Sequence, residues 1–373
     1  MSDISHVAVV AAPQRPAVRR SWLRPERIKG LSLVAVLLAT ILLFNVVVDD
    51  YLSSRFVSRL LIAVSITALL AAGESLVIIT RNIDLSVGAT VGVSAYLTAE
   101  LLADNRGLPA VAAVAFAVAI GAALGLVNGL LVAVARVPSI IVTLGTLSIF
   151  RSVLTSHAGG QTIATGSLPT WLIDLPRSTV FTIGDYEVRT MFALAVVIVV
   201  LLHLAMQFTR GGRHLYALGS NPEAARQAGL RDRRLEIAAF VACGALAGLA
   251  GFLYVGRFGT INVTAGSGLE LAAIAAAVVG GVSTLGGSGT VMGAFLGAVL
   301  IALLDQSLVR VQQISEFWRD AILGTLILLA VVLDVSVGRR LRAAARTDAL
   351  SEARPVGPQQ TGPNTIRNGV SDG

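Results

Sequence analysis

Long apolar stretches alternate with short polar ones along most of the chain, and this alternation predicts a series of membrane-spanning helices. Runs of about 18 or more mostly apolar residues recur, which is long enough for a helix to cross the ~30 Å hydrocarbon core of a bilayer. The pattern indicates ten spans, at residues 31–48, 56–80, 89–102, 109–135, 139–154, 190–208, 235–254, 269–282, 290–304 and 317–335. It therefore predicts an all-α, polytopic membrane protein with about ten transmembrane helices.

Polar segments flank and interrupt the membrane domain, residues 31–335. Residues 1–30 form a polar N-terminal tail without a signal-peptide cleavage pattern. Residues 336–373 begin with a basic cluster, continue rich in Pro, Gly and Asn, and are expected to be disordered. Residues 155–188 form the longest segment between spans; they are too polar to span, and their role is left open.

Residues 209–234 contain a short helix whose two ends are specified by the sequence. Asn221 suits the N-cap and Pro222 the first helical position. Glu223 lies in the first turn, where the helix dipole favours an anion, and Gly229 is a natural stop. The interior consists of good helix formers, Ala224, Ala225, Arg226, Gln227 and Ala228. A helix this short is marginal alone, so it either simply joins two spans at the surface or lies against a partner.

The composition agrees with a membrane protein and excludes several kinds of site. The chain of 373 residues is 55% hydrophobic and 14% charged, with a mean hydropathy of +0.78, whereas soluble proteins carry about 25% charged residues. The single cysteine, Cys243, excludes an internal disulfide and a cysteine-rich metal site. We expect neither a metal nor a cofactor.

Lys29 is the only lysine, and it lies outside any phosphate-binding loop. That loop needs a lysine in G-x-x-x-x-G-K-[ST], so this chain cannot hydrolyse ATP by the usual means. The metalloprotease motif H-E-x-x-H and the hydrolase motif G-x-S-x-G are also absent. The sequence therefore predicts a protein that is not an enzyme.

The positive charge is concentrated in three segments. The two tails and residues 209–234 each hold six basic residues, together 18 of the 29. The alternation of spans places all three on one side, and the positive-inside rule makes that side cytoplasmic. The net charge of +7 is thus explained by topology, without nucleic-acid binding.

A few polar residues within or between spans are candidates for function. Hydroxyl groups in membrane helices often bond back to their own helix, and lining of a pathway is the alternative reading for Asn128, Thr143, Thr146 and Ser148. The polar turn with Asp84, Ser86 and Gly88 either caps or forms the turn between the adjoining helices, or contacts a partner on the cytoplasmic side or lines the inner mouth of a pathway. Residues 74–92 and residues 270–293 have the same order of features. Each begins with a glutamate and an apolar segment, continues through a polar turn, and ends in a helix of small residues. This shared order suggests two structurally repeated halves.

Four motifs in order resemble the permeases of monosaccharide ABC importers of the ribose, xylose and rhamnose type. They are I-D-L-S-V-G at 83–88, V-P-S-I-I-V-T-L-G-T-L-S-I-F-R at 137–151, Y-A-L-G-S-N-P-E-A-A-R-Q-A-G at 216–229, and E-L-A-A-I-A-A-A-V-V-G-G-V-S-T-L-G-G-S-G-T at 270–290. The resemblance covers about residues 31–334. It implies a permease domain in the bacterial inner membrane, paired with a second permease chain in a homodimer or heterodimer. It also implies an ATPase on the cytoplasmic face and an external, periplasmic sugar-binding protein.

The resemblance implies a role for the capped helix and leaves the substrate open. Asn221, Pro222, Glu223, Ala224, Ala225, Arg226 and Gly229 would belong to the coupling helix that docks on the ATPase. The substrate would be a rhamnose-like deoxyhexose or a pentose, and a furanose-type quorum-sensing signal is an alternative. A proton-coupled transporter and an intramembrane enzyme need ionisable groups at mid-membrane. Here most carboxylates fall near span ends, with His203 the main exception.

Overall fold

The computed structural model describes residues 25–311 and, beyond them, residues 318, 321, 322, 324, 325, 328 and 332. The longer helices are α1 Pro25–Val47, α2 Ser54–Ile79, α3 Val87–Asp104, α4 Ala110–Ala133, α5 Ser139–Ala158, α7 Thr190–Phe208, α10 Asp232–Phe258, α11 Leu269–Val279 and α12 Val291–Leu308. These nine helices occupy the first nine predicted spans. Most of the predicted span at 317–335, and residues 1–24 and 336–373, lie outside the described part.

Six of the described helices are long and apolar enough to cross a membrane: α2, α4, α5, α7, α10 and α12. Shorter apolar helices occur at Leu33–Val47, within α1, and at α11. At 1.5 Å per residue, the 11 residues of α11 reach only about 16 Å, roughly half the hydrocarbon core. The chain is therefore a polytopic helical membrane protein, as predicted, and α11 is too short to cross the hydrocarbon core alone.

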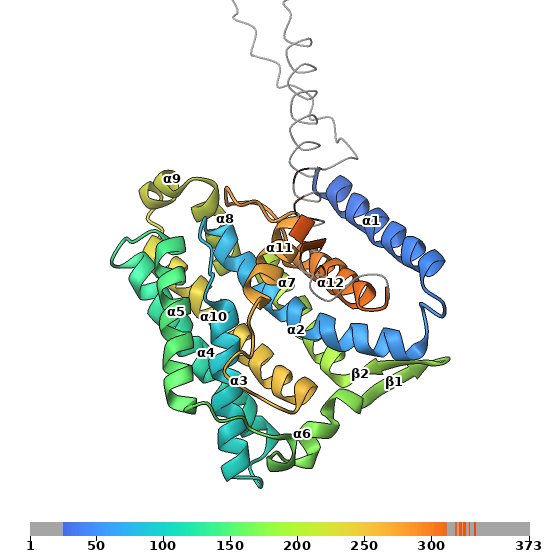
Figure 1. The fold of residues 1–373 in the computed structure, drawn as a ribbon. Coiled ribbons are helices and arrows are strands. Elements are labelled where there is room, and N and C mark those ends of the chain that lie inside the picture. The colour runs from blue at the N-terminus through green and yellow to red at the C-terminus, as the bar shows by residue number, and fades with distance from the viewer. Residues whose placement is uncertain are drawn as a thin grey trace, which may run out of the picture. The chain divides into compact units, whose positions relative to one another are not determined.

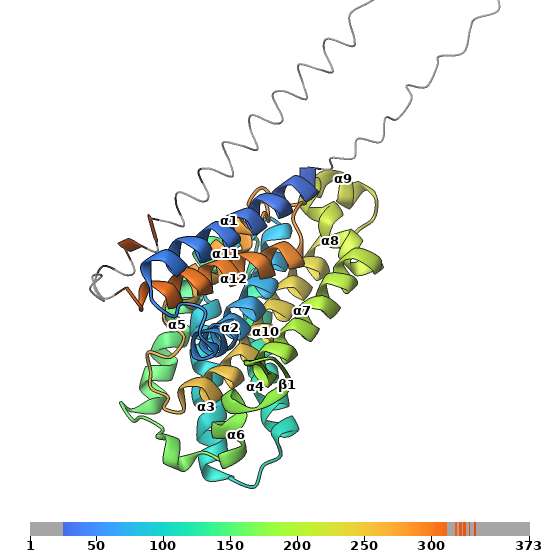
Figure 2. The same ribbon diagram turned by 90° about the vertical axis from the view of Figure 1, so that its right-hand side faces the viewer.

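Helix α2 is the centre of the packing (Figures 1 and 2). Its most apolar window is 94% buried, against 22% in α4 and α7. Helices α7, α10, α11 and α12 all contact it. The outer helices instead keep apolar side chains such as Val111, Ile141 and Leu201 exposed, which suits a face that meets lipid.

Glycines allow α4 and α10 to cross closely. A Cβ added at Gly244 would lie 2.2 Å from the Gly121 carbonyl oxygen, and one at Gly248 would lie 2.1 Å from that of Ala117. Neither position has room for a side chain. The G-x-x-x-G pattern of Gly244 and Gly248 is therefore a helix-packing site.

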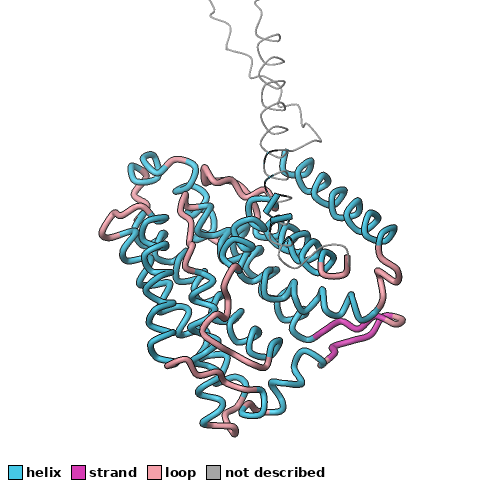
Figure 3. The backbone as a smooth tube through the Cα atoms, viewed as in Figure 1, coloured by secondary structure: helices cyan, strands magenta, loops and turns pink. Residues whose placement is uncertain are grey.

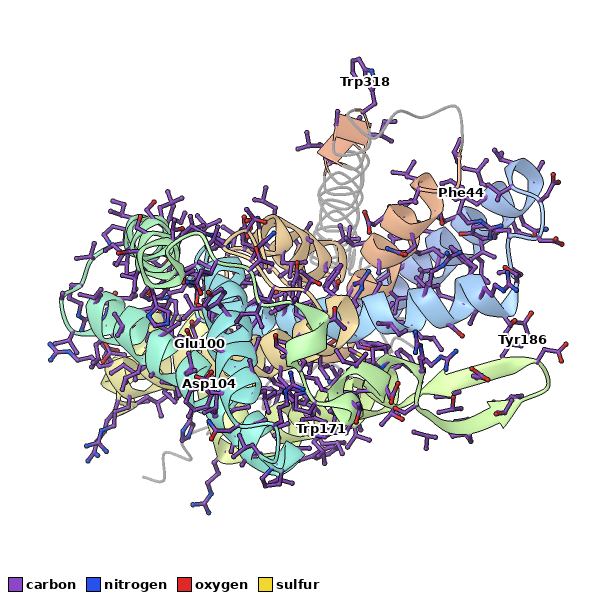
Figure 4. All side chains as sticks on the ribbon, turned by 60° about the horizontal axis from the view of Figure 1, so that its bottom comes forward. Phe44, Glu100, Asp104, Trp171, Tyr186 and Trp318 are labelled. Carbon is purple, nitrogen blue, oxygen red and sulfur yellow. The ribbon has the colours of Figure 1, made fainter. Side chains whose placement is uncertain are left out.

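The segment between α5 and α7 contains structure that the hydrophobic pattern did not predict. It holds the short helix α6, Thr170–Asp174, and an antiparallel hairpin of β1, Thr179–Ile183, and β2, Tyr186–Arg189 (Figure 3). Tyr186 lies on this hairpin, away from Glu100 and Asp104 on α3 (Figure 4). Gly184 and Asp185 form the turn, a residue pair suited to hairpins. The strands were missed because they are short and largely exposed.

The two segments expected to be repeated end their first helices in the same way. The Arg81 amide donates to the Ile78 carbonyl and the Asn82 amide to that of Val77. In the second segment Gly281 donates to Val278 and Val282 to Ala277. Both are caps in which one residue adopts a positive φ. That residue is Arg81 in the first segment and Gly281 in the second, so only the first cap carries a side chain at this position.

Candidate functional site

Helix α9, Pro222–Gln227, is capped as the sequence predicted. The Asn221 Oδ1 accepts a hydrogen bond from the Ala224 amide at 3.1 Å, and Pro222 occupies the first turn. Beyond the helix Gly229 has φ +80°, and the Leu230 amide donates to the Ala225 carbonyl. The local geometry of both predicted ends is confirmed.

One side of α9 faces the protein and the rest is open. Ala225 is 5% exposed, whereas Glu223, Ala224 and Gln227 are exposed. Arg226 reaches Asp232 at the start of α10, with Nη1 to Oδ2 at 3.5 Å. The helix is thus seated on the membrane domain by a small apolar contact and presents a surface on which a partner could lie.

Helix α8, Arg210–Ser220, precedes α9 and was not predicted. The Thr209 hydroxyl caps it by accepting a hydrogen bond from the Gly212 amide at 3.2 Å. Its inner face consists of Gly212, Leu218 and Gly219, which are buried, and Leu215, which is half-buried. This helical spacing and the threonine cap were the available signals. Together α8 and α9 form the helical part of residues 209–234, which we call the coupling loop.

The end of α8 meets two other turns of the chain. A Cβ at Gly219 would lie 1.8 Å from the Ile79 carbonyl oxygen at the end of α2. The Gly287 amide donates to that same carbonyl at 2.9 Å, and the Ser220 hydroxyl donates to the Gly287 carbonyl at 3.3 Å. The Tyr216 hydroxyl donates to the Gly289 carbonyl at 2.8 Å. We call this meeting of residues 79–81, 216–220 and 286–289 the three-turn junction.

Two arginines with positive φ hold the coupling loop, one at its middle and one near its C-terminal end. Arg81, φ +69°, donates from Nε to the Gly219 carbonyl at 2.5 Å and from Nη2 to the Ser220 carbonyl at 2.8 Å. Arg136, φ +59°, lies between α4 and α5 and donates from Nη2 to Asp232 Oδ2 at 3.2 Å. The second contact is the more exposed, with Arg136 at 48%. Neither arginine was singled out from the sequence.

The turn expected to contact a partner is instead buried. Asp84 is 2% exposed, Ser86 is 0% exposed and Gly88 is also buried. Asp84 Oδ1 accepts from the Ser86 amide at 2.9 Å and from its hydroxyl at 2.6 Å. Burial raises the pKa of the Asp84 carboxyl, although these hydrogen bonds oppose the shift. Within this chain Asp84 and Ser86 bond each other, which fits the turn-forming reading; contact with a partner stays a prediction.

Three further buried groups complete this polar cluster. The Asn128 amide donates to the Ser86 hydroxyl at 2.7 Å. Glu74 Oε1 accepts from the Asp84 amide at 2.9 Å, and the Cys243 thiol lies 3.6 Å from Glu74 Oε2. The cluster therefore ties α2, α4 and α10 to the turn between α2 and α3.

The four residues proposed to line a pathway divide into two kinds. Asn128, Thr143 and Thr146 are buried, and Thr143 donates to the Ser139 carbonyl of its own helix at 2.9 Å. Ser148 is exposed, as are Ser152 and Ser156 one and two turns further along α5. Of these four residues Ser148 alone is exposed, and with Ser152 and Ser156 it forms what we call the α5 serine face. Asn128, Thr143 and Thr146 do not reach the surface of this chain.

Comparison with known proteins finds transport permeases as relatives of this chain. The family model described as branched-chain amino acid transport system / permease component matches residues 56–331. The chain is 38% identical to the autoinducer 2 import system permease protein LsrC of Enterobacter sp. (strain 638) over 325 residues, 86% of this chain and 92% of that protein. It is 38% identical to the LsrC protein of Yersinia pseudotuberculosis serotype O:3 (strain YPIII), over 85% of this chain and 86% of that protein. It is 36% identical to the LsrC protein of Yersinia enterocolitica serotype O:8 / biotype 1B, over 89% of this chain and 90% of that protein. No solved structure gives a significant match.

Proposed function

The chain belongs to this permease family and is the membrane-spanning permease of an ABC importer, and from this premise we propose that it forms the pathway for a monosaccharide or a closely similar small polyol. A separate ATPase would drive transport from the cytoplasmic face. An external binding protein would deliver the substrate. A second permease chain would complete the pathway.

The observation that carries the proposal is the coupling loop. Helix α9 has both ends fixed, is seated on the membrane domain through Ala225, and leaves Glu223 and Gln227 open. A short capped helix that lies outside the spans can move as one body when a partner binds it. We propose that Asn221, Pro222, Glu223, Ala224, Ala225, Arg226 and Gly229 form or support the ATPase contact.

The orientation of the chain follows from its arginines. Six basic residues lie in the coupling loop, and by the positive-inside rule we assign it and both tails to the cytoplasm. The hairpin of β1 and β2 would then lie on the external side, where the binding protein docks.

The α5 serine face is a candidate for the pathway wall. Ser148, Ser152 and Ser156 are exposed along one side of a helix that is long enough to cross the membrane. Hydroxyl groups gain little from lipid but can bond the hydroxyl groups of a sugar or of a second chain. We propose that the pathway runs along this face, between two permease chains.

The names of the similar proteins favour a second substrate, autoinducer 2. A permease that offers few charged groups to its substrate leaves selectivity to the binding protein. The same pathway therefore suits a sugar or a furanose-type signal of similar size and polarity.

Uptake into proteoliposomes tests the proposal. The permease would be co-expressed with its neighbouring ATPase and binding protein, and labelled rhamnose, ribose, xylose and autoinducer 2 would be offered in parallel. We expect ATP-dependent uptake of one of the four, unaffected by a protonophore. The isolated chain should not hydrolyse ATP, since it lacks a P-loop lysine. Uptake that follows the proton gradient without ATP would overturn the proposal.

A further inference from the structure

Arg81 occupies a backbone position that glycine usually fills. It has φ +69° at the cap that ends α2, and the equivalent caps after α9 and α11 use Gly229, φ +80°, and Gly281, φ +86°. A side chain at positive φ adds strain energy to the turn. Glycine would make the same turn without that cost, so the turn alone does not account for an arginine here.

The arginine side chain bridges to the residues just before the coupling helix. Its two donors reach the carbonyls of Gly219 and Ser220, the last residues of α8. A cation at a helix C-terminus also meets the negative end of the dipole. Asn221, the N-cap of α9, follows directly. Arg81 therefore joins the start of the coupling helix to the end of α2.

Helix α2 is the element through which movement at this point would spread. It is the most buried of the candidate spans and contacts α7, α10, α11 and α12. The third part of the junction, residues 286–289, leads into α12 and is bonded to both α2 and α8. A displacement of α9 thus reaches the end of α2 through the Arg81 side chain and through the close packing of Gly219 on Ile79. It reaches the segment before α12 through the Ser220 and Tyr216 hydroxyls.

We propose that Arg81 is a positioning residue that transmits movement of the coupling helix to α2, and so couples ATP hydrolysis to transport. The proposal rests on the proposed function, because it requires an ATPase docked on α9. Arg81 acts through α8 and need not contact the ATPase or the substrate.

Arg81→Gly is the variant that separates the side chain from the turn. Glycine adopts a positive φ freely, so the cap remains and the membrane domain should fold. Both bonds to the end of α8 are lost. Arg106→Ala is the matched control, because Arg106 is also exposed and donates to one carbonyl, that of Gly166, far from the coupling loop. Arg81→Lys keeps the charge but loses the two-donor geometry.

The readout is uptake per ATP hydrolysed in proteoliposomes, with whichever of the four labelled substrates the unaltered complex imports. Co-purification of the ATPase and membrane abundance are measured on the same samples. We expect Arg81→Gly to retain the ATPase and its hydrolysis while the ratio falls about tenfold or more, because both charge-assisted hydrogen bonds to the end of α8 are lost. Arg81→Lys should restore part of it, and Arg106→Ala should match the unaltered complex.

Two results would overturn the inference. An unchanged ratio in Arg81→Gly would show that the side chain transmits nothing. Loss of the ATPase at normal abundance would show that Arg81 contacts the partner directly. Failure of the unaltered complex to import any of the four substrates with ATP would instead count against the proposed function.

Discussion

Asp84 is a buried residue of the turn that joins α2 to α3, and Ser86 depends on its carboxylate as an acceptor. The Ser86 amide and hydroxyl both donate to it. The sequence identified this aspartate as either a cap or a partner contact. It could not decide between them, because burial depends on α4 and α10, which are distant in the chain.

We predict that Asp84→Leu destabilises the permease because it leaves buried donors without an acceptor. Each such group costs about 1–3 kcal/mol. The free energy of unfolding in detergent should fall by at least that amount, whereas Asp84→Asn, which keeps one acceptor oxygen, should lose less. Asp104→Leu, at the exposed end of α3, is the control. Equal stability of Asp84→Leu and Asp104→Leu would contradict the assignment of the carboxylate as an acceptor.

At the coupling helix, Glu223→Arg and Gly229→Val should abolish uptake while the protein remains in the membrane. The first reverses the charge of an exposed side chain, and the second forces a β-branched residue into φ +80°. The apolar packing of the spans is untouched. Gly160→Val carries a similar strain at φ +79°, in the open turn after α5, and controls for it. Full uptake with the ATPase still bound to Glu223→Arg would reject α9 as the docking helix.

At the scale of elements, the hydrophobic pattern predicted the long helices and missed the short ones. Spans are specified locally, by length and apolarity, so α7 was placed correctly at 190–208. Helix α8 and the hairpin are held by contacts with other segments, such as Gly219 against Ile79 and the Tyr186 hydroxyl on the Leu52 carbonyl. Those contacts have no signature in a window of sequence.

The α4–α10 crossing makes a prediction at this scale. Gly248→Leu should prevent the two helices from approaching, because the new Cβ would meet the Ala117 carbonyl at 2.1 Å. We expect a marked loss of folded protein, measured by size-exclusion profile and thermal stability in detergent. Gly145→Leu on α5, where a Cβ meets nothing within 4 Å, should behave as the unaltered protein. Comparable profiles for the two variants would show that the crossing is not close in the membrane.

At the scale of the whole molecule, the arginine distribution predicts one orientation. Single cysteines at Gln227 in the coupling loop and Thr182 in the hairpin, in a Cys243→Ala background, should differ in their access to a charged thiol reagent. Both positions are exposed. In intact spheroplasts Thr182→Cys should react and Gln227→Cys only after lysis. The reverse pattern would invert the topology.

The candidate site was predicted in its local parts and not in its connections. The caps of α9 could be read from Asn221 and Gly229 because each cap is a property of a few adjacent residues. Arg81 lies 138 residues before Gly219, whose carbonyl accepts its hydrogen bond. The residues next to Arg81 in the sequence form no motif that predicts this contact. The number of arginines in each segment could be used to predict which side of the membrane the segment lies on. Which arginines contact the coupling loop is seen only in the folded structure.

The burial of α2 also has a consequence for biogenesis. A ribosome delivers α2 early, whereas α7, α10, α11 and α12, which cover it, are made later. Until those helices are synthesised, the faces of α2 that they later cover must contact lipid. The apolar sequence of α2 makes that contact favourable. Glu74 is the exception, yet its first donor, the Asp84 amide, is synthesised only ten residues afterwards. The most deeply buried of the described spans is therefore one that must first be stable without its later neighbours, and the backbone donor of its buried glutamate is synthesised before α4.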